Sequence, residues 1–145
     1  MNQQNYQSSI TANVTPTEAF DGIGRVNEWW AKNIEGSAEK LNDVFTVRFP
    51  GETFVTFKVS ESVRGEKIAW QVTDCYLPWL KDKTEWNGTT VVFEISPLGD
   101  ETQVTMTHIG LVPEVECYAQ CERGWNDHFR NSLFQYLTQQ KGSPV

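Results

Sequence analysis

The sequence has few basic residues and no long run of apolar ones. Its 145 residues include 12 Lys and Arg against 19 Asp and Glu, which gives a net charge of −7 at pH 7. Because binding to phosphate groups needs a basic surface, this excess of acid disfavours nucleic acid or anionic lipid as a general partner. No apolar run approaches the roughly 20 residues that a membrane-spanning helix requires, so we expect no membrane span.

Cysteine is scarce, and its number is odd. The three cysteines, Cys75, Cys117 and Cys121, fit reduced thiols better than a framework of disulfides. The first five residues are polar and lack the basic and apolar regions of a secretory signal. We therefore predict a cytoplasmic protein with reduced cysteines.

Aromatic residues, by contrast, are abundant. The chain has six Trp, eight Phe and four Tyr, more than a small core normally needs. Its length is close to the commonest size of one domain. We expect a single domain over residues 1–145, with a core from about 6 to 141 and flexible termini.

The first part of the chain predicts one strand and two short helices. Alternating apolar residues predict a strand over 6–14. Thr15, Pro16 and Glu18 then form the pattern of a capping box with proline in the first helical position. Glycines at 22 and 24 interrupt this helix before a second short one over 25–32.

The remainder predicts an antiparallel sheet and a long helix. Alternating runs predict strands over 44–49, 54–60, 67–74, 84–96 and 102–110, joined by short turns. From 114 to about 140, apolar residues recur every three or four positions, as in an amphipathic helix. Such a helix must cover one face of the sheet. We predict an α+β fold with a curved antiparallel sheet wrapped around a long C-terminal helix and two short helices after the first strand.

Several short motifs occur in this order along the chain. They are Thr15-Pro16-Thr17-Glu18-Ala19-Phe20, Trp29-Trp30, Lys67-Ile68-Ala69-Trp70, Trp86-Asn87-Gly88-Thr89, Thr105-Met106-Thr107-His108-Ile109-Gly110-Leu111 and Gly124-Trp125-Asn126-Asp127-His128-Phe129. From about Ile10 to Lys141 the sequence resembles the START-like (SRPBCC) superfamily. Within it, the sequence is similar to the branch of the C-terminal domain of the activator of heat-shock protein 90 ATPase.

The resemblance implies a helix-grip fold, in which a seven-stranded antiparallel sheet grips a long helix. Members of the superfamily often enclose an apolar cavity for lipids, hormones, polyketides or other small hydrophobic molecules. Some members are enzymes, and the activator domain itself contacts a chaperone.

We therefore predict a non-enzymatic domain that binds a small hydrophobic ligand or lipid between the sheet and the C-terminal helix. The expected wall consists of inward-facing apolar side chains with two polar anchors. The wall residues are Trp30, Phe45, Phe57, Trp70, Phe93, Met106, Trp125 and Phe129, and the anchors are Asp74 and His108.

The two polar anchors also allow an enzymatic alternative. Asp74 is in phase with Trp70, and His108 is in phase with Met106, so each is expected to point toward the inner face. A carboxylate and an imidazole in an apolar cleft could act as acid and base in a small-molecule cyclase or hydrolase. The alternative is that Asp74 and His108 each lie near the end of a strand and are simply hydrogen-bonded or exposed to solvent.

Other chemistry has less support. Cys117 and Cys121 lie four residues apart with His128 two turns later, but a convincing fourth metal ligand is missing. Buried thiols are the simpler interpretation. Nothing in the sequence places a base beside Cys75. The glycines at 22 and 24 do not form a phosphate-binding loop, so we expect no metal, nucleotide or other cofactor.

The loop from Tyr76 to Lys83 is unusually apolar. It contains Leu77, Trp79 and Leu80. It could be a lid over a cavity, or a surface patch through which a co-chaperone-like module binds a chaperone or another protein. Alternatively, Trp79 folds back onto its own core.

Overall fold

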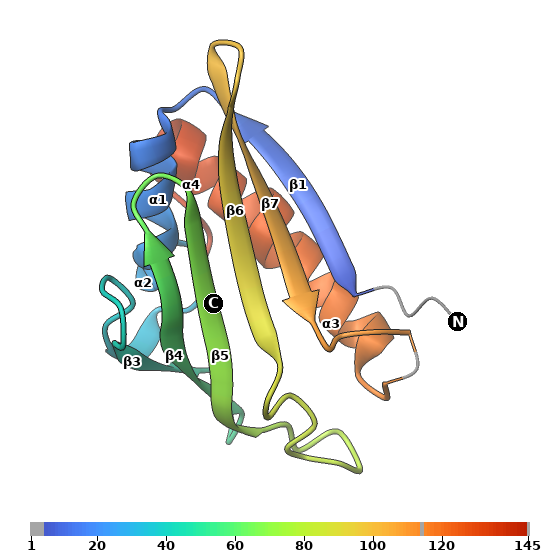
Figure 1. Ribbon diagram of the computed structural model, residues 1–145. Helices are drawn as coiled ribbons and strands as arrows, with labels where there is room; N and C mark the ends of the chain where they lie inside the picture. Colours follow the sequence, from blue (N-terminus) through green and yellow to red (C-terminus); the bar gives the residue numbers. More distant parts are fainter. Residues whose placement is uncertain (1–4, 114, 145) are drawn as a thin grey trace.

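A long helix lies across one face of a seven-stranded sheet (Figure 1). The computed structural model describes residues 5–113 and 115–144. In chain order the elements are β1 (Tyr6–Ala12), α1 (Pro16–Gly24), α2 (Val26–Trp29), β2 (Asn33–Gly36), β3 (Val44–Arg48), β4 (Phe54–Val63), β5 (Lys67–Tyr76), β6 (Thr90–Leu98), β7 (Glu101–Ile109), α3 (Tyr118–Trp125), η1 (Asn126–Leu133) and α4 (Phe134–Gln139).

Every pair of neighbouring strands in the sheet is antiparallel, in the order β1-β7-β6-β5-β4-β3-β2. The predicted α+β fold of helix-grip type is confirmed. The sequence patterns did not predict β2, because four residues are too few to show an alternation. None of the helices in the described part of the chain is long and apolar enough to cross a membrane.

The predicted capping box opens α1. The hydroxyl of Thr15 accepts the backbone N–H of Glu18 at 3.1 Å, and the Glu18 carboxylate accepts the N–H of Thr15 at 2.9 Å. Pro16 occupies the first helical position. The second helix is shorter than predicted, with only four residues in α2. Both short helices pack beside the long helix, α1 against α4 and α2 against η1.

The C-terminal helix begins at Tyr118, later than predicted. Glu114, its expected first residue, lies outside the described residues. The helix continues through α3, η1 and α4, and η1 has the wider winding of a π-helix. Its buried apolar residues recur every four positions at Cys121, Trp125, Phe129, Leu133 and Leu137. In an α-helix each such step runs about 40° past a full turn, so the wider winding of η1 keeps these side chains facing the sheet.

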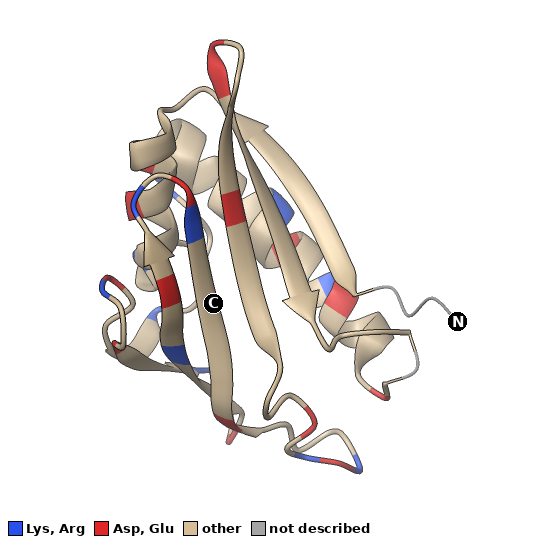
Figure 2. Ribbon diagram, in the orientation of Figure 1, with Lys and Arg blue, Asp and Glu red and all other residues tan. Residues whose placement is uncertain are grey.

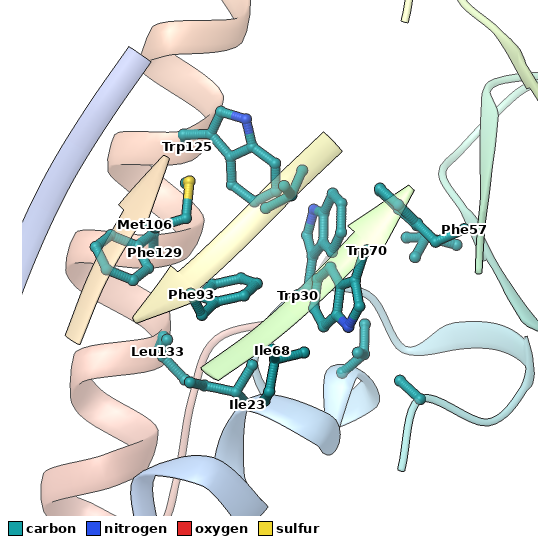
Figure 3. Close-up of a cluster of buried hydrophobic side chains, with 14 of the residues drawn as sticks. Ile23, Trp30, Phe57, Ile68, Trp70, Phe93, Met106, Trp125, Phe129 and Leu133 are labelled. Atoms are coloured by element: carbon teal, nitrogen blue, oxygen red, sulfur yellow. The ribbon is translucent and has the colours of Figure 1, made fainter. Parts of the chain in front are cut away.

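Aromatic rings fill the middle of the space between sheet and helix (Figure 3). The ring of Trp70 lies 4.8 Å from that of Phe93 and 5.0 Å from that of Phe45, measured between centroids. Phe57 and Phe129 are completely buried in the same cluster. Rings at these distances are in direct contact, so this region is a packed core.

Candidate functional site

A largely apolar pocket lies toward one end of the contact between sheet and helix. Its volume is about 280 Å³. Its wall combines the end of α2, the β3–β4 hairpin, the β5–β6 loop (residues 77–89) and the start of the long helix. The lining residues are Trp30, Phe49, Thr53, Val55, Leu77, Trp79, Trp86, Gln120, Cys121, Gly124, Trp125 and His128. None of them is Asp, Glu, Lys or Arg, so the wall carries no carboxylate, ammonium or guanidinium group. Its polar side chains are those of Thr53, Gln120 and His128.

A glycine within the helix keeps part of this pocket empty. Gly124 lies in α3 and lines the pocket, and a Cβ atom placed on it meets no other atom within 4 Å. Glycine in a helix costs about 1 kcal/mol relative to alanine. Gly124 therefore leaves space in the pocket at a cost to the stability of α3.

The large apolar side chains of the β5–β6 loop are folded back onto the protein, except that of Trp79. Leu77 and Leu80 are buried, whereas Trp79 is 47% exposed beside the pocket. The expected apolar loop therefore divides into two parts, because its leucines join the core and its tryptophan stays at the surface. Figure 2 shows acidic and basic residues on this loop.

Two glutamates hold the loop against the start of the long helix. The Glu116 carboxylate accepts the backbone N–H of Lys81 at 3.0 Å. The Glu85 carboxylate accepts the N–H groups of Glu116 and Cys117 at 3.1 and 3.0 Å. Each segment thus supplies a carboxylate to the backbone of the other, which fixes the mouth of the pocket.

His108 lies behind the pocket wall, with both ring nitrogens engaged. Its Nδ1 is 3.0 Å from the indole nitrogen of Trp125, and its Nε2 is 2.9 Å from the hydroxyl of Thr89. It is completely buried, and this burial lowers the pKa of its imidazole to about 3. His108 is therefore neutral at pH 7 and does not line the pocket.

Asp74 points away from the interior, so the predicted inward orientation is wrong. The pairing of β4 with β5 is irregular at this point, because Thr56 lies opposite Asp74 but Phe57 lies opposite Val72. The additional residue on β5, Thr73, is a bulge that shifts the alternation of the following side chains. Asp74 is exposed and accepts the backbone N–H of Cys75. The structure does not bring Asp74 and His108 together.

His128 is the histidine that does line the pocket. Its ring centroid is 6.1 Å from that of Trp30 and 6.5 Å from that of Phe49. Burial lowers the pKa of its imidazole, and only the nearby carboxylate of Asp127 opposes this effect. At neutral pH the pocket therefore receives no positive charge from His128.

Two tryptophans of the wall have indole N–H groups without a partner. The Nε1 atoms of Trp30 and Trp86 are shielded from solvent and have no acceptor among the described residues. Trp70 has the same deficiency, but it lies in the core and does not line the pocket. Buried donors without acceptors are rare, and two of these three border one pocket.

Of the ten predicted ligand-binding residues, only Trp30 and Trp125 line the pocket. Six others are buried within the packed core instead, namely Phe45, Phe57, Trp70, Phe93, Met106 and Phe129. The pocket residues that the wall prediction missed include Gly124 and His128. Both stand in the motif 124–129, and Trp79 was already singled out by its apolar loop.

Two of the three cysteines lie side by side. The sulfur atoms of Cys117 and Cys121 face each other, with the Cα atoms of the two residues 5.6 Å apart, and Cys75 is free and buried. Four-residue spacing at the start of a helix places both side chains on one side of it. Among the described residues, no three His, Cys, Asp or Glu side chains are grouped as a metal site would require.

Comparison with known proteins gives a family model and several similar structures. The model described as "Activator of Hsp90 ATPase homolog 1-like protein" matches residues 19–138. No curated protein matches the sequence.

The solved structures agree with the fold. The Aha1 dimer from Colwellia psychrerythraea has a TM-score of 0.77 at 23% identity, over 95% of this chain and 98% of that one. The protein SSP2350 from Staphylococcus saprophyticus has a TM-score of 0.72 at 12% identity, over 97% and 96%. DynU16, from the dynemicin biosynthetic locus, has a TM-score of 0.71 at 15% identity, over 97% of this chain and 49% of that one. At these identities the likeness shows the fold alone.

Proposed function

The chain belongs to the Activator of Hsp90 ATPase homolog 1-like family, and from this premise we propose that it binds one small, largely apolar molecule without converting it. The binding site is the pocket beside Trp30 and Trp125. The observation that carries the proposal is a well-formed apolar space kept open by Gly124, where a side chain could have filled it.

The dimensions of the pocket favour a small ligand. Its volume of about 280 Å³ is just below the usual range for small-molecule sites, about 300–1,000 Å³. Burial of one Phe-sized group contributes about 1.5–3 kcal/mol, so a molecule of two fused rings gains about 3–6 kcal/mol, which corresponds to dissociation constants from millimolar down to tens of micromolar.

The polar groups around the pocket favour binding over catalysis. General acid–base catalysis needs a titratable side chain that reaches the ligand. Asp74 is exposed on the outside, and both nitrogens of His108 are already hydrogen-bonded. Cys121, which does line the pocket, is paired with Cys117. His128 also lines the pocket, but no Asp or Glu lines it as a partner for that imidazole. These positions argue against the cyclase or hydrolase alternative that uses Asp74 and His108.

The test compares two substitutions at one glycine. Gly124→Leu places a branched side chain into the pocket, whereas Gly124→Ala adds only a Cβ atom in open space. Titration with tetralin, followed by the fluorescence of the tryptophans and by thermal shift, should show binding to the wild type and to Gly124→Ala. Gly124→Leu should be folded but should not bind. Equal binding by all three proteins, or binding by none, would overturn the proposal.

A second candidate function is a protein-interaction module of co-chaperone type. It is favoured by the exposure of Trp79 on a loop whose other large apolar side chains are buried, and by the family description, which refers to activation of the Hsp90 ATPase. The test measures stimulation of an Hsp90-type ATPase by the wild type and by Trp79→Ala. Leu98→Ala is the matched control, because Leu98 is similarly exposed but lies in the β6–β7 hairpin, outside the pocket.

A further inference from the structure

We propose that the ligand of this pocket is neutral and carries an acceptor oxygen, such as a ketone, ester or amide carbonyl, which pairs with an indole N–H of Trp30 or Trp86. This inference rests on the proposed function and specifies the chemical class of the ligand. It is carried by the unpartnered donors in the pocket wall and by the absence of ionised side chains among the residues that line it.

The other tryptophans show that this protein can satisfy buried indoles. The N–H of Trp29 donates to the carbonyl oxygen of Ile23 at 3.2 Å, and that of Trp125 donates to His108 at 3.0 Å. Trp30 and Trp86 are only 2% and 8% exposed, yet their N–H groups have no acceptor among the described residues. A buried donor without a partner is costly, and a ligand oxygen would relieve that cost.

The rings that carry the two donors both contact Trp125. The ring centroid of Trp30 is 4.8 Å from that of Trp125, and the ring of Trp86 is stacked on Trp125 at 6.0 Å. Both nitrogen atoms are shielded from water, so a ligand oxygen can reach one of them only when that ring turns toward the pocket. Binding should therefore change the environment of a particular indole N–H group.

The uncharged wall disfavours anionic ligands most strongly. A carboxylate or phosphate in this pocket would lose its hydration without meeting a cation, because His128 is neutral at pH 7 and no Lys or Arg lines the wall. An ammonium group would gain cation–π contact with the aromatic rings, but it would meet no carboxylate and would leave both indole donors unpaired. A neutral acceptor is the polar group that suits donors in an uncharged wall.

The experiment uses four probes with one bicyclic frame. They are tetralin, α-tetralone, protonated 1-aminotetralin and tetralin-1-carboxylate. Each is titrated into ¹⁵N-labelled protein while the indole N–H resonances are recorded. We expect α-tetralone to bind about tenfold more tightly than tetralin, the factor that corresponds to one recovered hydrogen bond of ordinary strength. The Trp30 or Trp86 resonance should move downfield.

Internal controls come from the same spectrum. Trp70 has an unpartnered N–H but does not line the pocket, and the N–H of Trp29 is already bonded. Their resonances should show no downfield shift of this kind. In Trp30→Phe or Trp86→Phe, whichever removes the responding donor, the ratio of α-tetralone affinity to tetralin affinity should fall from about ten to about one. The ratio is the readout because both probes lose the same ring contact in the variant.

The outcomes separate this inference from the proposed function. If tetralin binds but α-tetralone binds no more tightly and moves neither wall indole, the acceptor inference is overturned and the apolar site remains. Tightest binding of the ammonium or carboxylate probe would also overturn it. If none of the four probes binds, the proposed function fails and the inference fails with it.

Discussion

The indole N–H of Trp125 donates a hydrogen bond of 3.0 Å to Nδ1 of His108, and this bond fixes the tautomer of the histidine. An indole nitrogen can only donate, so Nδ1 is the acceptor and the ring proton is on Nε2. That proton is donated to the hydroxyl of Thr89, which in turn donates to the carbonyl oxygen of Trp86 at 2.6 Å. The chain of bonds joins two tryptophans of the pocket wall through one buried histidine.

The first prediction concerns stability at acid pH. The pKa of His108 is lowered to about 3 by burial, whereas an unfolded histidine titrates near 6.5. Between these two pKa values the histidine is protonated in the unfolded chain but not in the folded protein. The free energy of unfolding therefore falls as pH falls, and it has its full value only above about pH 6.5. Over this range His108 alone should reduce the free energy of unfolding by about 1.4 kcal/mol per pH unit. Urea unfolding between pH 7 and 5 measures this slope.

Two variants isolate the contribution of His108 to that slope. The pKa of His128 is also lowered by burial, so its effect has the same sign. His108→Gln should flatten the pH dependence more than His128→Gln does, since His108 is the more deeply buried of the two. An unchanged slope in His108→Gln would contradict a neutral, buried imidazole.

The second prediction tests the hydrogen-bond chain at Thr89. Thr89→Val keeps the shape of the side chain but leaves the Nε2 proton of His108 without an acceptor. An unsatisfied buried group costs about 1–3 kcal/mol, and the indole resonance of Trp125 should shift because its acceptor is perturbed. Thr89→Ser retains the hydroxyl and is the control. Urea unfolding and the indole spectrum measure both effects. If Thr89→Val and Thr89→Ser have the same stability and the same Trp125 resonance, the proposed series of hydrogen bonds is wrong.

Local patterns in the sequence predicted the fold well but the site poorly. The capping box at Thr15 and the alternation along β5 up to Val72 depend on residues adjacent in the chain, so they are readable in one sequence. The bulge at Thr73 depends on the register between β4 and β5, and no pattern in β5 alone reveals it. For this reason Asp74 was placed on the wrong face.

The position of the pocket depends on packing, which a single sequence does not show. Periodicity identified the inward-facing rings, but it could not distinguish rings that fill the interior, such as Phe93, from rings that border a space, such as Trp125. Gly124 and His128 become pocket residues only because the β5–β6 loop and the β3–β4 hairpin close around them. The motif that contains them can be recognised in the sequence, but its position in the pocket wall cannot.

The third prediction compares two glycines at which alanine should have opposite effects. Gly124→Ala should raise the free energy of unfolding by up to about 1 kcal/mol, because alanine is the better helix former and its Cβ meets no atom within 4 Å. At Gly142 a Cβ would lie 2.5 Å from the carbonyl oxygen of Glu28, so Gly142→Ala should lower it by about 1–3 kcal/mol. Urea unfolding of both variants provides the comparison.

Ser143 provides the control for the Gly142 variant. Its backbone N–H donates to the hydroxyl of Ser132 at 2.7 Å, and that hydroxyl donates to the carbonyl oxygen of Trp29. Ser143→Ala keeps the backbone bond and should change stability by less than about 0.5 kcal/mol. A loss in Ser143→Ala as large as in Gly142→Ala would show that the steric argument is wrong.

The last prediction separates the two kinds of side chain in the β5–β6 loop. Trp79 is 47% exposed and lines the pocket, whereas Leu77 is buried. Trp79→Ala should therefore weaken tetralin binding about tenfold, through loss of ring contact, and should change the free energy of unfolding by less than about 1 kcal/mol. Leu77→Ala removes a core side chain and should cost about 2–5 kcal/mol of stability. Titration and urea unfolding of both variants measure the two effects. A stability loss in Trp79→Ala as large as in Leu77→Ala would place Trp79 in the core, and unchanged tetralin affinity would remove it from the ligand site.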